Sequence, residues 1–111
     1  MKEFLMTPLE TAVLDRFRDL YGKDGFPAVD KINVVGRQVT PSGRYVHLAS
    51  DNQTQIEDGY LDLGGSYIEL DGLPNGLMAV VTVERRRVKI LEFASYGGES
   101  WDGSEHKWAI V

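Results

Sequence analysis

Apolar side chains recur every three or four residues near the start of the chain. The residues with this helical spacing are Leu9, Val13, Leu14, Phe17 and Leu20. The segment Thr7-Pro8-Leu9-Glu10 combines a threonine that can cap a helix, a proline suited to the first turn and a glutamate that can complete a capping box. Because Gly22 offers a left-handed stop, the pattern predicts a helix over residues 8–21, with Glu10 and the other charged residues away from the apolar face.

The following chain contains short runs of β-branched, aromatic and apolar residues separated by turn residues. Strands are predicted at residues 32–39, 45–48, 60–63, 66–70, 77–83 and 88–94. Gly64-Gly65 is typical of a tight hairpin turn and would join the third and fourth of these strands. The two most apolar runs, 77–83 and 88–94, are expected to be central strands joined by an exposed turn at 84–87.

One helix followed by several closely spaced strands predicts an α+β fold. The N-terminal helix would pack on a mostly antiparallel sheet of five to six strands, because the connections are too short for crossover helices. The length of 111 residues and the hydrophobic content of 42% suit a single domain with one core over residues 1–111.

The chain carries a formal net charge of −5, and the excess is confined to its middle third. Residues 45–84 contain seven Asp and Glu residues and no Lys or Arg, whereas residues 1–44 and 85–111 each carry a net charge of +1. Nucleic acid is a poor direct partner for such a region, since its binding relies on Lys and Arg at phosphates. A basic protein is a better partner, because opposite charge steers association.

The composition also restricts location and chemistry. The chain has no cysteine, residues 1–10 lack the apolar run of a signal peptide, and no apolar run has membrane-spanning length. We therefore expect a cytoplasmic protein without disulfides or a membrane partner. His47 and His106 are not spaced as metal ligands, and no serine lies in a Gly-x-Ser-x-Gly elbow. No catalytic residue, metal site or cofactor is expected, which favours a non-enzymatic protein.

Glu92 lies within the apolar run 88–94 and permits two interpretations. If Val88 and the other even-numbered residues of this run face the core, Glu92 is buried and needs a partner such as Arg37 or Arg44. If the odd-numbered residues face the core, Glu92 is solvated. In the first arrangement these residues and His47 could surround a pocket between helix and sheet, as in a small enzyme or ligand binder.

Tyrosines alternate with carboxylates in the acidic middle third. The candidate partner-binding residues are Asp58, Tyr60, Asp62, Tyr67, Glu69, Asp71 and Trp101. Residues two apart in a strand share a face, so the first three can line one surface, and Tyr67 and Glu69 another. Carboxylates would speed association with a basic partner while the rings supply buried contacts, although the same residues suit a solvated sheet face. Trp101 and Trp108 either cap the end of the core or provide an exposed ring.

Several short segments together resemble a group of small bacterial proteins. They are Gly72-Leu73-Pro74-Asn75-Gly76, the strand at 77–83, the pair Leu91-Glu92, the tail at 96–101 and the helix start Leu9-Glu10. The group is similar in size, charge and layout to immunity proteins of bacterial toxin systems. The resemblance implies an immunity-type binding role and transfers no catalytic residue.

Together these features predict a non-enzymatic, acidic protein-binding module that acts as an immunity protein or inhibitor. Its partner would be a basic protein, such as a nucleic-acid-acting toxin or effector. A phage-borne inhibitor of host defence, of the anti-CRISPR type, shares these features and is an alternative. A homodimer formed through edge strands, or through the region of Trp101 and Trp108, is a further alternative.

Overall fold

A capped helix opens the computed structural model, which describes residues 5–111; residues 1–4, part of the segment considered above for a signal peptide, lie outside it. Helix α1 covers Pro8–Tyr21, as predicted. The Thr7 hydroxyl accepts a hydrogen bond from the Glu10 N–H at 3.1 Å, and the Glu10 carboxylate accepts one from the Thr7 N–H at 2.9 Å. The predicted capping box is therefore present. No helix within residues 5–111 is long and apolar enough to cross a membrane.

The buried stripe of α1 differs from the predicted one in two places. Leu20 is 48% exposed, because the stripe continues from Phe17 to Tyr21, four residues later, and the two rings stack with centroids 6.1 Å apart. Glu10, which was expected away from the apolar face, is fully buried. The helix therefore carries a charge into the core, and that charge needs partners from the sheet.

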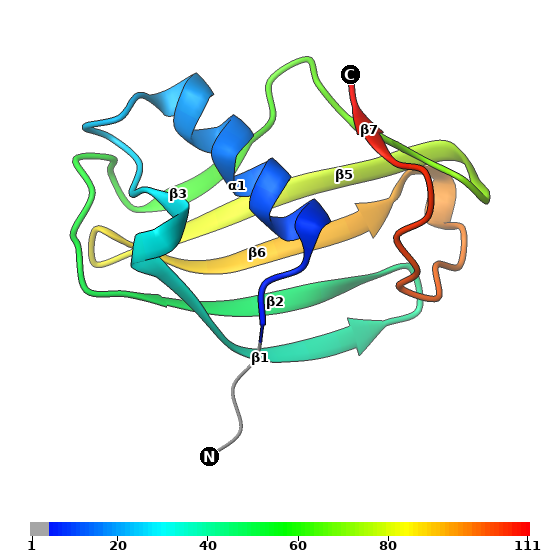
Figure 1. Ribbon diagram of the computed structural model, residues 1–111, viewed down its shortest axis with the longest axis horizontal. Helices are drawn as coiled ribbons and strands as arrows, with labels where there is room; N and C mark the ends of the chain where they lie inside the picture. Colours follow the sequence, from blue (N-terminus) through cyan, green and yellow to red (C-terminus); the bar gives the residue numbers. More distant parts are fainter. Residues whose placement is uncertain (1–4) are drawn as a thin grey trace.

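Within residues 5–111, seven antiparallel strands form one sheet, on which α1 packs (Figure 1). They are β1 (Ile32–Thr40), β2 (Gly43–Ser50), β3 (Gly59–Asp62), β4 (Ile68–Leu70), β5 (Leu73–Glu84), β6 (Arg87–Ser95) and β7 (Ala109–Ile110). The order is β1-β2-β6-β5-β4-β7, with β3 also paired to β5. The predicted α+β class is confirmed, and β5 and β6 are central. The strand count exceeds the predicted five to six because the C-terminal tail adds β7 to β4.

Strands β3 and β4 do not form the predicted hairpin. Both pair with β5 instead, β3 with residues 80–83 and β4 with residues 73–77. This arrangement satisfies backbone groups along the long edge of β5, which a separate hairpin would leave unpaired. Gly64-Gly65 consequently lies in the loop that connects two successive partners of the same strand.

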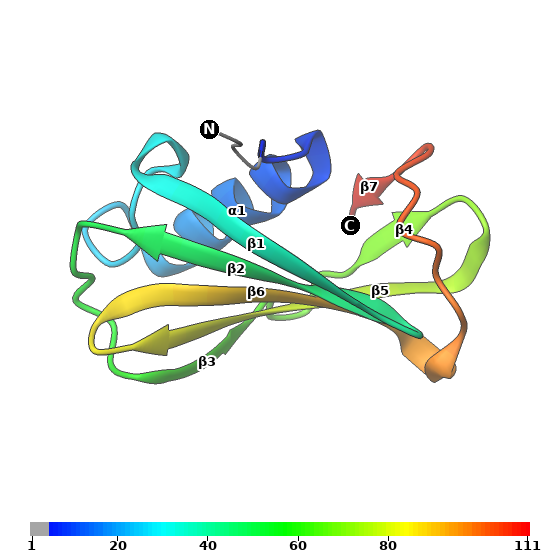
Figure 2. The same ribbon diagram turned by 90° about the horizontal axis from the view of Figure 1, so that it is seen from below.

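Helix α1 covers one face of the sheet, and in the described part of the chain no helix covers the other face (Figure 2). The core lies between α1 and the sheet. Its largest fully buried side chains include Phe17, Phe26, Leu91 and Phe93. The opposite face of the sheet is consequently open to contact with other molecules.

The hairpin of β5 and β6 turns through two arginines in an unfavourable backbone conformation. Arg85 and Arg86 have φ values of 53° and 62°, in the left-handed region that glycine and asparagine adopt more readily. The Asp58 carboxylate accepts hydrogen bonds from both of their backbone N–H groups, each at 2.9 Å. The turn lies where the sequence predicts it, and a loop residue distant in the chain supports it.

Replacing both residues, Arg85→Asn with Arg86→Gly, should stabilise the protein by about 1 kcal/mol, because the new residues tolerate the left-handed conformation. Urea denaturation of the purified chain measures the change. The control variant Arg85→Gln with Arg86→Gln removes the same charges without relieving the strain, and its stability should stay within about 0.5 kcal/mol of the wild type. Equal stabilisation of the two variants would contradict the strain argument.

Candidate functional site

Cross-strand pairing determines which side chains form the uncovered surface of the sheet. Directly paired residues of antiparallel strands share a face. One row across the sheet contains His47, Ile90, Thr82 and Tyr60, and the next contains Tyr45, Glu92, Val80 and Asp62. Met78 and Ala94 form a further pair in the same series. These ten residues are called the open face below.

Glu92 lies on the open face because the register of β6 with β5 shifts between Val88 and Ile90. Val88 is fully buried in the core, whereas Ile90, two residues later, belongs to the open face. An extra residue at this irregularity therefore interrupts the simple alternation of buried and exposed side chains. The interpretation that places Val88 and Glu92 on one buried face is wrong. The alternative, in which Leu91 and Phe93 face the core, is confirmed, since both are at most 1% exposed.

The candidate residues of β3 lie at one end of the open face. Tyr60 is 80% exposed, and Asp62 is exposed on the same face, as the sequence predicts. Asp58 precedes the strand and contacts the β5–β6 turn. Hydrogen bonds from the backbone N–H groups of Arg86 and Arg85 lower the pKa of its carboxyl. Tyr60 and Asp62 are therefore available to a partner, while Asp58 has a structural contact of its own.

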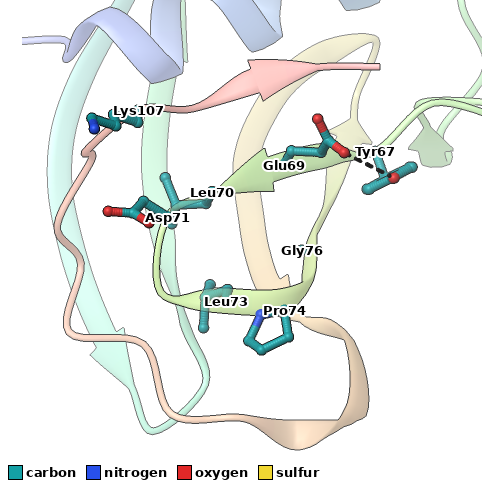
Figure 3. Close-up of a pocket in the computed structure, with 8 residues that line it drawn as sticks. All are labelled: Tyr67, Glu69, Leu70, Asp71, Leu73, Pro74, Gly76 and Lys107. Carbon is teal, nitrogen blue, oxygen red and sulfur yellow. Dashed lines mark hydrogen bonds between the residues drawn. The ribbon is translucent and has the colours of Figure 1, made fainter.

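The candidate residues in and beside β4 line a separate hollow of about 290 Å³ (Figure 3). Tyr67, Glu69 and Asp71 point away from the core, because the two apolar residues between them are buried. The Tyr67 hydroxyl donates a hydrogen bond to the Glu69 carboxylate at 3.5 Å. Lys107 lines the same hollow on the Asp71 side, so its charge offsets part of the local negative charge.

Trp101 is 5% exposed and belongs to the core, which corresponds to the first of the two placements considered for it. Its ring packs edge-on against Phe93 with centroids 6.0 Å apart, and the Arg44 guanidinium lies 4.9 Å from its centroid. The indole N–H donates a hydrogen bond to the Ser104 carbonyl at 2.9 Å. Trp101 therefore offers no exposed ring to a partner, and Trp108 packs partly buried against the same core.

Arg37 and Arg44 lie on the helix side of the sheet and pair with Glu10, not with Glu92. Arg37 donates two hydrogen bonds to the Glu10 carboxylate, at 2.6 Å and 3.0 Å, and Arg44 Nη2 lies 3.1 Å from its Oε2 atom. His47 and Glu92 are on the opposite, open face. The residues considered for a pocket between helix and sheet therefore do not converge, which removes the basis for that arrangement.

Glu10 is held in its charged form although it is fully buried. Burial raises the pKa of its carboxyl, but hydrogen bonds from Arg37 and the Thr7 N–H, together with the charges of Arg44 and Arg37, outweigh that effect and lower the pKa from its ordinary 4.5. Arg44 also pairs with Glu105. The four side chains Glu10, Arg37, Arg44 and Glu105, called the buried ion cluster, balance two negative against two positive charges.

A groove of about 680 Å³ lies on the open face. Its lining includes Tyr45, Tyr60, Ile90 and Glu92, with Glu84 at its border among the exposed residues. Tyr45 was not among the residues predicted for a site, and Glu92 was considered only for a pocket on the helix side of the sheet, because the groove depends on the register of four strands. The alternation of side chains in β2, where Tyr45 and His47 flank the buried Val46, could have indicated that Tyr45 lies on the open face.

Metal ligation and similarity to known proteins add no further candidate site. Within residues 5–111, no group of three or more His, Asp or Glu side chains could hold a metal ion. Comparison with protein-family models, with curated proteins and with solved structures gives no significant match. The open face is therefore the surface whose geometry bears on function.

Substituting Glu10→Gln should destabilise the protein by about 3 kcal/mol, because it leaves the half-buried Arg37 guanidinium without a carboxylate and the buried Arg44 guanidinium with Glu105 alone. Chemical denaturation at neutral pH measures this loss. The matched control is Glu92→Gln on the open face, where Glu92 makes no ion pair with residues 5–111; its effect should be below about 0.5 kcal/mol. Equal effects of the two substitutions would show that the buried ion cluster is not a principal stabilising contact.

The stability difference between the wild type and Glu10→Gln should depend on pH. Since folding lowers the pKa of Glu10, its stabilising effect is present above the ordinary value of 4.5 and is lost as the pH falls through the lower folded value. Denaturation curves of both proteins, recorded between neutral and acidic pH, give their free energies of unfolding. The two free energies should converge below pH 4.5. A constant difference across that range would contradict the assignment of a charged Glu10.

Proposed function

We propose that this protein is a non-enzymatic binding protein of the immunity or inhibitor type. Its partner is a basic protein, such as a nucleic-acid-acting toxin or effector, and the contact surface is the open face together with Glu69 and Asp71, in and just after β4. The resemblance to immunity proteins of bacterial toxin systems supports this choice of class. A cytoplasmic location is part of the proposal, since a chain without cysteine suits a reducing compartment.

The observation that carries the proposal is the position of Tyr60. Its side chain is 80% exposed on a sheet face that no helix covers in the described chain. A tyrosine on a strand can bury a large ring with little loss of conformational freedom, and tyrosine is enriched among residues that dominate binding energy. Val80 and Ile90 on the same face add apolar area that a partner would bury with it.

Free carboxylates around this ring account for the choice of a basic partner. Asp62 and Glu92 lie on the open face, and neither takes part in the ion pairs found within residues 5–111. Glu69 and Asp71 extend the negative region at the β4 end, where Lys107 reduces it in part. Unpaired carboxylates on one side of a protein accelerate association with a positively charged surface.

Removing three of these charges should weaken binding. The wild-type chain, immobilised and exposed to lysate of the source organism at low ionic strength, should retain a basic protein that is released by high salt. The variant with Asp62→Asn, Glu69→Gln and Asp71→Asn should retain about fivefold less of that protein, because the steering and contact charges are lost. Quantitative mass spectrometry of the retained fraction measures the difference.

The control variant carries Asp15→Asn, Asp19→Asn and Asp24→Asn, which changes the net charge equally. These carboxylates are exposed on α1 and in the loop that follows it, away from the open face. The control should retain the partner within about twofold of the wild type, since its contact surface is intact. Recovery of no basic protein by the wild type at low salt, or equal losses in the two variants, would refute the proposal.

A further inference from the structure

Glu92 occupies the centre of the open face and is surrounded there by uncharged side chains. Tyr45 and Val80 are its directly paired neighbours on β2 and β5. Ile90 and Ala94 lie before and after it on the same face of β6. Because paired side chains have Cβ atoms about 5 Å apart, the carboxylate lies next to an aromatic ring and apolar groups.

The Glu92 carboxylate is half-buried and has no cationic partner among the described residues. The ion pairs of residues 5–111 all belong to the buried ion cluster, on the other side of the sheet. Arg37 and Arg44 are thus unavailable to it. A partly desolvated carboxylate without a partner is unfavourable, so an incoming cation would gain from pairing with it.

Two tyrosines complete the surroundings of this carboxylate. Tyr45 is directly opposite Glu92, and Tyr60 lies in the next row of the open face, on β3. Both tyrosines line the 680 Å³ groove together with Glu92 and Glu84, and among the residues that the structure describes no Lys or Arg lines it. The groove therefore combines aromatic rings with negative charge, which is the environment that binds organic cations.

We propose that this groove binds the side chain of an arginine from the partner protein, with its guanidinium group against the Glu92 carboxylate and beside the tyrosine rings. The inference rests on the proposed function, since the basic partner provides the arginine. A guanidinium fits better than an ammonium, because it is planar, stacks on aromatic rings and donates two parallel hydrogen bonds to a carboxylate. An anion would be repelled, and a purely apolar group would bury Glu92 without a partner.

The probe for this site is the peptide acetyl-Gly-Arg-Gly-amide, titrated into the isotopically labelled chain and followed by NMR. The amide signals of Tyr45, Tyr60 and Glu92 should shift together. Glu92→Gln should weaken the peptide's affinity about tenfold and Tyr60→Ala about threefold, whereas the control Asp15→Asn on α1 should change it less than about twofold. Tyr60→Ala tests the site independently if Glu92→Gln alters the whole spectrum, since Tyr60 is 80% exposed and contributes little to folding.

Three results would overturn the arginine site. They are shifts confined to other parts of the chain, equal weakening by Asp15→Asn and Glu92→Gln, and equal affinity for acetyl-Gly-Lys-Gly-amide. The lysine peptide should instead bind several-fold more weakly, because its ammonium group lacks the planar fork.

The capture experiment distinguishes failure of this site from failure of the proposed function. If the Glu92→Gln variant retains the basic partner as well as the wild type does, the arginine site is refuted and the proposed function stands. If the wild type retains no basic protein while the arginine peptide still binds at Glu92, the proposed function is refuted and the site stands. Loss of both the peptide and the partner in Glu92→Gln, with the control unaffected, is the result expected.

Discussion

The pairing of Glu10 with Arg37 and Arg44 is the interaction on which the rest of the structure depends. It connects the first turn of α1 to β1 and β2, and through Glu105 it also connects the C-terminal segment. A buried carboxylate tolerates little displacement, because its attraction to the guanidinium groups must offset the loss of hydration. The cluster therefore fixes which face of the sheet the helix covers, and it leaves the other face exposed.

This arrangement separates the charges of the molecule into two sets. Two of its arginines turn inward beneath the helix, where Arg44 also packs against the rings of Phe93 and Trp101. The carboxylates of β3, β4 and β6 remain outside and take no part in the ion pairs found within residues 5–111, although Lys107 lines the hollow beside β4. The negative character of the open face thus has two causes. One is the composition of the chain, and the other is that Arg37 and Arg44 pair with Glu10 on the opposite side of the sheet.

Local features of the fold could be predicted from residues close together in the sequence. The bounds of α1, its capping box, the central position of β5 and β6 and the turn between them all follow from propensity and alternation over a few residues. The predicted hairpin of β3 and β4, which depended on pairing between strands, is wrong. Gly64-Gly65 has the composition of a hairpin turn, yet the long edge of β5 pairs with both neighbouring strands.

The sequence by itself determined the α+β class, the capped helix and the concentration of acidic residues in the middle third, since these depend on residue types and near neighbours. Only the tertiary structure decided that Glu10 is buried with two arginines, that Trp101 lies in the core, and that Tyr45, Tyr60 and Glu92 share one groove. The register shift in β6 illustrates the physical reason. A single irregularity reverses which side chains face the core, and its location depends on pairing with β5 rather than on the residues of β6 alone.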